Sequence, residues 1–397
     1  MTRGVLYLTY TGLLEPLGQS QVLAYQERMA ADGPIHIVSF ERPEDLDDVG
    51  KLDALRARAQ ESGIHWHPQR YHKRPSALAT LWDIAVGTWV GLRLVRRNGL
   101  GIVHARSYVA SVMALLIKRR TGARFLFDMR GFWADERVDG GLWPRDGRMY
   151  RMAKWFERRF LLQADHVVSL THAAAAEIRR FDYLQGRVPP ITVIPTCADL
   201  ERFKPSASPK DGAFTLGYVG SAGTWYLFDA AVAAFNALRQ RVPEARFLII
   251  NRDAHAYIRE RLQAGHVPEA CVELRQTAHA EVPEQIQRMH AGVFFIKPVF
   301  SKQASAPTKL AEFLGCGVPC LSNTGVGDMA QILGDDRVGI AVDAMDPAGI
   351  DAGVEALLQL VADPDIASRC VASAARHFSL VEGVARYRAV YEAMCNA

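Results

Sequence analysis

A lysine and a glutamate three positions apart are the residues best suited to hold a charged ligand that carries hydroxyl groups. Lys309 and Glu312 stand in the segment SAPTKLAEF, where Pro307, with the hydroxyl residues Ser305 and Thr308 around it, predicts the start of a helix. The free N–H groups of a helix start, together with a lysine, suit a diphosphate. An ionised carboxylate only accepts hydrogen bonds and therefore suits the two hydroxyls of a ribose. The alternative is an ordinary ion pair between residues i and i+3 on a helix surface.

Two glycine-rich turns follow predicted strands and could bring the backbone close to such a ligand. After the strand predicted at 214–219 the chain reads GSAGT, and the successive N–H groups of such a turn can hold a phosphate. We therefore predict ligand contacts from Gly220, Ser221, Gly223 and Thr224. The opening strand is followed by a turn that contains Gly12, for which we also predict a ligand contact, although the GxGxxG spacing of a dinucleotide site is absent. In both places a tight turn without a ligand is the alternative.

Charged and aromatic residues gather where two strands of the N-terminal half end. Asp128 ends one predicted strand and is followed by Arg130 in the segment FDMRGFWADE. Because ligands bind at the carboxyl ends of parallel strands, we predict that Asp128 and Arg130 orient a second substrate during catalysis. Further contacts to that substrate are predicted from His104, Arg106, Trp133, Asp135 and Glu136. The alternative is a set of structural ion pairs around a buried tryptophan.

The sequence does not favour a metal site. His65 and His67 would share one face of a strand, with His72 nearby, but Pro68 interrupts them and no carboxylate or cysteine accompanies them. We therefore predict no metal ligands. The six cysteines form no CxxC pair, which favours free thiols in a reducing compartment.

Basic residues are concentrated in the N-terminal half. Residues 1–190 hold 28 Lys and Arg against 20 Asp and Glu, whereas the rest of the chain holds 19 against 23. A basic surface attracts nucleic acid, anionic lipid or a phosphorylated ligand. Together with Trp82 and Trp89 on an apolar helix, these basic groups predict a surface that faces an anionic membrane. Solvated helix faces are the alternative.

The elements that must position these residues are short apolar strands that alternate with helices. This alternation predicts right-handed βαβ units and parallel sheets. The strands are predicted at 5–8, 35–40, 101–104, 124–128, 166–170, 191–194, 214–219, 246–250, 293–296, 318–322 and 339–342. A proline-rich stretch separates two such series. We therefore predict an α/β protein with two doubly wound domains that face a cleft: an N-terminal domain at 1–195, a linker at 196–209, a C-terminal domain at 210–378 and a final helix at 379–397.

The composition indicates a soluble folded protein. Hydrophobic residues make up 49% of the chain and charged residues 23%, which excludes an intrinsically disordered chain. The first strand begins without a signal-peptide pattern ahead of it, and Asp83 and Arg93 interrupt the longest apolar stretch, at 77–95. We expect a cytoplasmic protein.

Five segments of the sequence together resemble the family-4 retaining glycosyltransferases, which have the GT-B fold. In chain order they are GLLEPLGQSQVLAYQERMA, VHARSY, FDMRGFWADE, VIPTCADLERF and PTKLAEFLGCGVPCLSNTGVGD. The resemblance implies two Rossmann-like domains, of which the C-terminal one binds a nucleoside diphosphate sugar and the N-terminal one binds the acceptor. It also implies that Glu312 holds the donor's ribose and that the final helix crosses back to the N-terminal domain.

The sequence departs from the pattern of that family in three places. Ala304 stands where the family usually has a glutamate that contacts the donor sugar, so that contact is expected from nearby backbone or from Ser305. Ser221 and the Trp225–Tyr226 pair stand where the family often has an arginine and a lysine that grip the diphosphate, and we expect Lys309 to supply this charge. Arg130 stands where the family often has a histidine.

The resemblance and the residues together predict an enzyme that transfers a sugar, with retention of configuration, from a nucleoside diphosphate donor to a glycan or lipid-linked acceptor. We expect this reaction to serve the synthesis of a surface polysaccharide or glycoconjugate. We expect no cofactor and no required metal, no nucleic acid partner, and peripheral binding to the inner face of the cell membrane. The alternatives are a nucleotide-sugar 2-epimerase of the same fold and a non-catalytic subunit that binds a sugar nucleotide.

Overall fold

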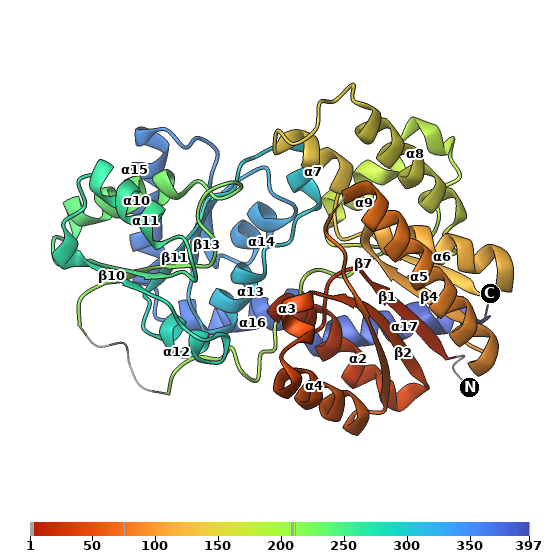
Figure 1. The fold of residues 1–397 in the computed structure, drawn as a ribbon. Coiled ribbons are helices and arrows are strands. Elements are labelled where there is room, and N and C mark those ends of the chain that lie inside the picture. The colour runs from red at the N-terminus through yellow and green to blue at the C-terminus, as the bar shows by residue number, and fades with distance from the viewer. Residues whose placement is uncertain (1–3, 75, 208–209, 211, 397) are drawn as a thin grey trace. The chain divides into compact units, whose positions relative to one another are not determined.

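The computed structural model describes residues 4–74, 76–207, 210 and 212–396, which form two compact units (Figure 1). The N-terminal unit comprises Met1–Ile194 and Val381–Ala397, and the C-terminal unit comprises Pro195–Leu380. The division falls at the start of the proline-rich stretch that the sequence predicts as a linker. The final helix belongs to the N-terminal unit although it follows the C-terminal unit in the chain.

The N-terminal unit is built on a parallel sheet of seven strands in the order β3-β2-β1-β4-β5-β6-β7. The strands are β1 (Val5–Thr9), β2 (Ile35–Glu41), β3 (Ile64–Arg70), β4 (Ile102–Arg106), β5 (Arg124–Asp128), β6 (His166–Ser169) and β7 (Ile191–Val193). The helices are α1 (Pro16–Gly18), α2 (Ala24–Met29), α3 (Pro43–Leu46), α4 (Val49–Glu61), α5 (Ser76–Asn98), α6 (Ser107–Thr121), α7 (Trp133–Asp139), α8 (Arg148–Gln163), α9 (His172–Arg179) and α17 (Leu380–Asn396). Because β1 pairs with both β2 and β4, the strand order reverses there, and a ligand is expected at the carboxyl ends of these strands.

The C-terminal unit repeats this plan with six parallel strands in the order β10-β9-β8-β11-β12-β13. The strands are β8 (Thr215–Val219), β9 (Arg246–Ile250), β10 (Val272–Arg275), β11 (Ala291–Val293), β12 (Cys320–Asn323) and β13 (Gly339–Val342). The helices are α10 (Phe228–Arg241), α11 (His255–Ala264), α12 (Val282–Gln287), α13 (Thr308–Gly315), α14 (Met329–Asp335), α15 (Pro347–Val361) and α16 (Ile366–Phe378). The order reverses between β8 and β11, so β8 ends at the point where this fold binds ligands.

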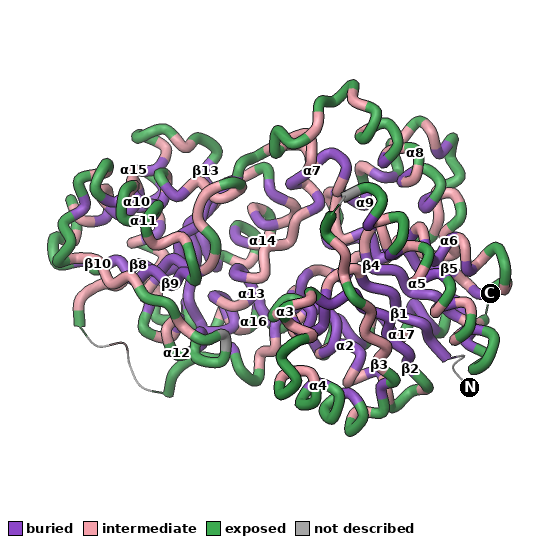
Figure 2. The backbone as a smooth tube through the Cα atoms, viewed as in Figure 1, coloured by how far each residue is buried: buried purple, intermediate pink, exposed green. Residues whose placement is uncertain are grey.

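The central strands form the core of each unit (Figure 2). Every residue of β1 and of β4 is buried, because helices cover both faces of a parallel sheet. The sequence predicts these apolar strands but not β3 and β10, two edge strands in which only Ile64 is buried. The strand predicted at 293–296 is also shifted, since β11 ends at Val293 and the backbone of Ile296 instead bonds to the buried side chain of Asn323.

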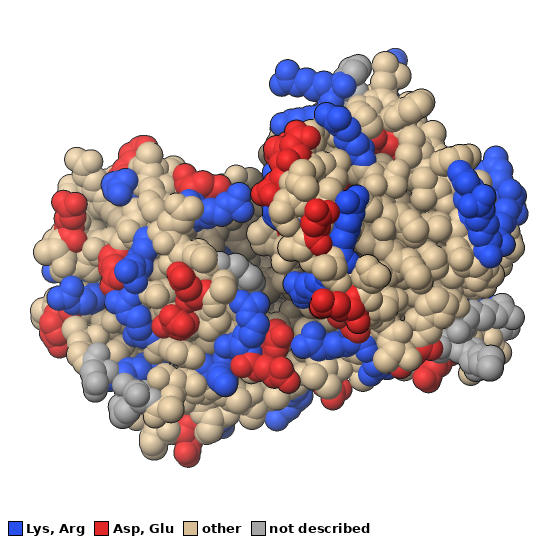
Figure 3. All heavy atoms as spheres, turned by 60° about the horizontal axis from the view of Figure 1, so that its bottom comes forward, with Lys and Arg blue, Asp and Glu red and all other residues tan. Residues whose placement is uncertain are grey.

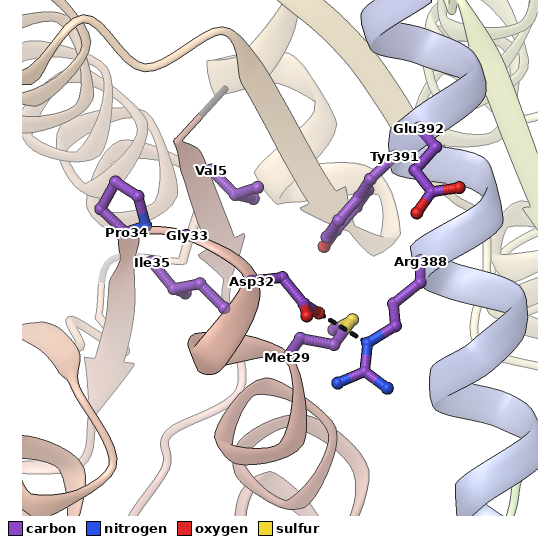
Figure 4. Close-up of a pocket in the computed structure, with 9 residues that line it drawn as sticks. All are labelled: Val5, Met29, Asp32, Gly33, Pro34, Ile35, Arg388, Tyr391 and Glu392. Atoms are coloured by element: carbon purple, nitrogen blue, oxygen red, sulfur yellow. Dashed lines mark hydrogen bonds and ion pairs between the residues drawn. The ribbon is translucent and has the colours of Figure 1, made fainter. Parts of the chain in front are cut away.

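Three polar side chains fasten α17 to the N-terminal unit. The hydroxyl of Tyr387 donates to Asp128 Oδ2 at the end of β5 (3.0 Å), and the hydroxyl of Tyr391 lies 2.7 Å from His104 Nδ1. Arg388 forms an ion pair with Asp32 (2.6 Å), and both residues line a cavity of about 230 Å³ (Figure 4). The lining of this cavity includes the first residues of β1 and β2, so it lies at the edge of the sheet opposite to the expected ligand edge.

We expect Tyr387→Phe to lower the free energy of unfolding by about 1.5 kcal/mol, because a buried carboxylate loses a hydrogen bond. The effect can be measured by urea unfolding followed through tryptophan fluorescence. Six of the seven tryptophans precede residue 195, so this signal reports mainly on the N-terminal unit. Glu382→Gln, an exposed change in the same helix, is the control and should leave the midpoint unchanged. A Tyr387→Phe midpoint equal to that of the control would contradict the anchoring role.

Candidate functional site

Helix α13 begins where the sequence predicts it and leaves its first N–H groups free of a side-chain cap. Pro307 takes the N-cap position in an extended conformation, and no side chain caps the helix there. The helix follows β11 and precedes β12, so its N-terminus lies toward the carboxyl edge of the C-terminal sheet. A helix start of this kind favours an anion.

Lys309, in the first turn of α13, is a buried ammonium group without a hydrogen-bond partner. The residue is 7% exposed, and no acceptor in the described part of the chain bonds to its Nζ. Instead, Nζ lies over three aromatic rings, at 3.6 Å from the ring centre of Tyr226, 5.1 Å from that of Tyr218 and 5.5 Å from that of Phe294. Cation–π contacts offset part of the cost of burying the charge, but an anion at this position would offset far more.

The glycine turn after β8 lies directly beside Lys309. A Cβ atom on Gly220 would be 3.4 Å from Lys309 Nζ, and Gly220, Gly223 and Thr224 all have positive φ angles. The N–H of Gly220 already donates to the carbonyl of Ile250 (2.9 Å). This N–H is therefore not available to a phosphate, contrary to the prediction, and contacts from this turn must come from its later residues.

Glu312 lies one turn further along α13 and is half-buried. Burial raises the pKa of Glu312 to about 7, although the charges of Lys309 and Arg202 oppose the shift. Burial likewise lowers the pKa of Lys309 to about 7, against the effect of Glu312. Lys309 Nζ has no hydrogen-bond partner in the described structure, and Lys309 is buried, so the alternative of a surface ion pair is wrong.

The lowered pKa of Lys309 predicts that diphosphate binding weakens as the pH rises above 7. Lys309 then loses its proton in the free protein, whereas the bound anion favours the charged form, so the affinity should fall about tenfold per pH unit. Isothermal titration calorimetry with a nucleoside diphosphate between pH 7 and pH 9 measures this slope. Lys309→Arg should flatten it, because a guanidinium stays charged throughout. A wild-type slope equal to that of Lys309→Arg would show that Lys309 does not titrate in the site.

The predicted catalytic pair of the N-terminal unit lies at the carboxyl end of β5. Asp128 is buried, and its Oδ1 has no hydrogen-bond partner among the described residues but lies 3.8 Å from Arg130 Nη1. Arg130 has a φ angle of 58°, a conformation that non-glycine residues seldom adopt. Burial alone would raise the pKa of Asp128, but the positive charge of Arg130 and contact with His104 keep it below its usual value. Asp128 is therefore an ionised, incompletely bonded carboxylate.

The residues predicted to contact the acceptor differ in whether their polar atoms are already bonded to other side chains of the fold. Arg106 is buried, and its Nε has no hydrogen-bond partner in the described residues. His104, by contrast, is completely buried, and its two ring nitrogens contact Tyr391 and Asp128, so neither is available to a ligand. This position favours a structural role for His104, contrary to the prediction.

Asp135 of α7 is also engaged within the fold. Its carboxylate accepts hydrogen bonds from Tyr150 (2.8 Å) and Lys154 (3.0 Å), and it is 2% exposed. Trp133 packs against Tyr108 with 5.4 Å between ring centres and remains half-buried. Trp133 and Glu136 are both partly exposed, whereas Asp135 is buried and fastens α7 to α8.

The first glycine turn binds a carboxylate of its own chain. Glu41, at the end of β2, is completely buried and accepts hydrogen bonds from the N–H groups of Leu13 (2.8 Å) and Leu14 (3.0 Å). A Cβ atom on Gly12 would lie 2.5 Å from Glu41 Oε2, which explains the glycine. The ligand contact predicted at this turn is therefore not supported, because Glu41 occupies the N–H groups. This role of Glu41 was not predicted, because its only signal in the sequence is an acidic residue at the end of an apolar strand.

The histidines considered as metal ligands do not converge. His65 and His67 stack with His36, whereas His72 bonds to Asp83. Across the described residues, no group of three or more His, Cys, Asp or Glu side chains is arranged to hold a metal ion.

Comparisons with known proteins match both units. A family model described as glycosyl transferase 4-like domain matches residues 19–197, and one described as glycosyl transferases group 1 matches residues 213–363. No curated protein sequence matches the chain.

Several solved structures of other proteins have the same fold as this chain. Sucrose-phosphate synthase from Thermosynechococcus elongatus has a TM-score of 0.73 at 12% identity, with 99% of each chain covered. HepE from Anabaena, in complex with UDP and glucose, has a TM-score of 0.70 at 13% identity, with 98% of this chain and 99% of that chain covered. The lipopolysaccharide outer core galactosyltransferase WaaB has a TM-score of 0.65 at 12% identity, with 98% and 99% covered.

These structural similarities establish the α/β GT-B fold with two Rossmann-like units, and the two family models together span most of the chain. The chain therefore belongs to the GT-B glycosyltransferases, with a glycosyl transferase 4-like domain followed by a glycosyl transferases group 1 domain.

Proposed function

We propose that this glycosyltransferase takes its sugar from a nucleoside diphosphate donor that binds at the N-terminus of α13. The observation that carries the proposal is the buried ammonium of Lys309, which has no hydrogen-bond partner in the described structure and lies beside the Gly220 turn. The diphosphate lies against Lys309 and the N–H of Thr308. Glu312 accepts hydrogen bonds from the ribose, while Ser305 and nearby backbone contact the sugar, since Ala304 has no polar side chain.

In the proposed mechanism, the protein stabilises the diphosphate as it leaves. The bond between the sugar's anomeric carbon and the diphosphate oxygen breaks, and negative charge develops on that oxygen. Lys309 and the N–H groups at the start of α13 stabilise this charge. These groups already supply positive charge, so we propose that the reaction requires no metal ion or other cofactor.

The acceptor binds at the carboxyl edge of the N-terminal sheet in this proposal. Asp128 and Arg130 orient the acceptor hydroxyl, and Arg106, Trp133 and Glu136 supply further contacts. The hydroxyl oxygen bonds to the anomeric carbon on the face that the diphosphate leaves, and its proton passes to the departing phosphate. The configuration at the anomeric carbon is thereby retained.

Structural relatives support a nucleotide donor and a glycan acceptor. HepE was solved with UDP and glucose, and WaaB is named as a galactosyltransferase of the lipopolysaccharide outer core. By this analogy we propose a glycan or lipid-linked acceptor in the synthesis of a surface polysaccharide or glycoconjugate.

A thermal-shift panel of UDP, GDP and ADP sugars, with Lys309→Met in parallel, tests the donor assignment. At least one donor should raise the melting temperature of the wild type and not that of the variant. A panel in which no compound stabilises the wild type would contradict nucleotide-sugar binding.

Incubation with the stabilising donor tests the reaction. Without an acceptor the donor should stay unchanged, and with a glycan acceptor NMR should show a product with the donor's anomeric configuration. An epimer formed without an acceptor would instead identify a 2-epimerase, and inverted configuration would contradict the mechanism.

A further inference from the structure

One helical layer of the N-terminal unit exposes an unusual share of apolar side chains. Helices α5 and α8 each pack against α6, and all three contact the same sheet (Figure 1). The described residues include twelve large hydrophobic side chains that are exposed, and eight of them lie on α5, on α8 or in the segment before α8. These eight are Leu78, Leu81, Trp82, Trp89, Leu142, Met149, Met152 and Trp155.

Helix α5 has the length and apolarity of a membrane span, but its inner face belongs to the fold. It includes the one stretch in the described residues, Ala77–Asn98, that could cross a membrane by length and composition, and only 33% of its most apolar window is buried. Its buried Asp83 accepts hydrogen bonds from Tyr10 (2.7 Å) and from the N–H of His72 (3.1 Å). A Cβ atom on Gly87 would lie 2.6 Å from the sulfur of Met113 in α6, so the two helices are closely packed. The helix therefore stays on the sheet and can offer only its outer face.

From its N-terminus to its C-terminus, the outer face of α5 carries first leucines, then tryptophans and finally arginines. Trp82 and Trp89 are 61% and 58% exposed, and the guanidinium of Arg93 lies 4.6 Å from the ring centre of Trp89. Helix α8 repeats the combination, because Trp155 is 50% exposed and Arg159 lies 4.7 Å from its ring centre. An exposed tryptophan beside an arginine is the pairing that suits the boundary between lipid tails and charged headgroups.

The charged side chains that α5 and α8 present at the surface are all basic. Their only acidic residues, Asp83 and Glu157, are both completely buried. Against them stand eight basic residues, which are Arg93, Arg96, Arg97, Arg148, Arg151, Lys154, Arg158 and Arg159. Figure 3 shows basic side chains gathered without acidic neighbours at the right-hand edge of the N-terminal unit, the side on which α6 lies in Figure 1.

The basic residues at the start of α8 do not stabilise the helix. Arg148 and Arg151 stand in or next to its first turn, which has no acidic residue and no side-chain cap. Positive charge at a helix N-terminus opposes the helix dipole, and no ion pair joins either arginine to another residue that the structure describes. Such residues are suited to an external anion.

We propose that the outer face of α5 and α8, which we call the lipid face, docks on an anionic bilayer with these helices lying parallel to the membrane surface. Trp82, Trp89 and Trp155 enter the headgroup region, and the arginines contact anionic lipid. The all-basic charge favours this occupant over a second copy of the chain, because two such faces would repel each other. The proposal is independent of the donor chemistry, but it would hold the enzyme where a lipid-linked acceptor resides.

Vesicle flotation of the full chain tests the proposal. The wild type should float with phosphatidylcholine vesicles that contain about one third phosphatidylglycerol, and not with phosphatidylcholine alone. Roughly 0.5 M salt should weaken the binding. Trp89→Ser with Trp155→Ser should reduce the partition coefficient at least about tenfold, and so should Arg148→Glu with Arg159→Glu. Circular dichroism checks that each variant is folded.

Helix α4 offers matched controls in the same unit. Val49→Ser removes an apolar side chain that is 65% exposed, and Arg56→Glu reverses an exposed charge, so both should float like the wild type. Equal binding to neutral vesicles, or lipid-face variants that float like the controls, would overturn the proposal. So would light scattering that shows a wild-type dimer which the tryptophan variant dissociates. Flotation does not depend on turnover. Failure of the membrane proposal would appear as loss of flotation, whereas failure of the proposed function would appear as loss of donor binding.

Discussion

Lys309→Met is expected to lower kcat/KM for the donor about a hundredfold, or ~2.7 kcal/mol, the size seen when a donor to a developing anion is removed. Methionine fills nearly the same volume among the rings of Tyr218, Tyr226 and Phe294. It also removes a buried charge, so the variant should be at least as stable as the wild type. Steady-state kinetics together with thermal melting therefore separate a loss of function from a loss of structure.

Lys204→Met is the control for this variant, because it removes an exposed lysine of the same unit. Its kinetics should match those of the wild type. If Lys309→Met also kept at least half of the wild-type kcat/KM, the lysine would be a packing residue and the proposed role would be wrong.

Glu312→Gln is expected to weaken nucleoside diphosphate binding roughly thirtyfold, because two ribose hydroxyls lose a charged acceptor. Inorganic pyrophosphate has no ribose, so its affinity should change much less. Calorimetry with both ligands gives the ratio of the two effects. Equal changes for the two ligands would show that Glu312 acts only through the charge of the site and not on the ribose.

The local signals of the sequence were sufficient to predict α13 and its candidate residues. Pro307 and the glycines that follow Leu314 mark the ends of the helix, and the structure has it at Thr308–Gly315. The apolar strands were predictable for a similar reason, since strands buried on both faces consist almost entirely of apolar residues. The edge strands β3 and β10 lack this signal because most of their residues are only partly buried or exposed.

Contacts between residues far apart in the chain could not be predicted in the same way. Tyr387, which bonds to Asp128, lies 259 positions away from it, and the helix that carries it gives no sign of the partner. The rings around Lys309 come from β8 and from two separate loops, so the burial that lowers its pKa depends on the whole unit. For the same reason the sequence could not show that Glu41 occupies the first glycine turn.

A crystal structure of the protein with a bound nucleoside diphosphate would test the central claim most directly. We predict that a phosphate oxygen lies within hydrogen-bonding distance of Lys309 Nζ, with the ribose hydroxyls on Glu312. A diphosphate bound in another place, with the Lys309 ammonium still surrounded only by its aromatic rings, would contradict it.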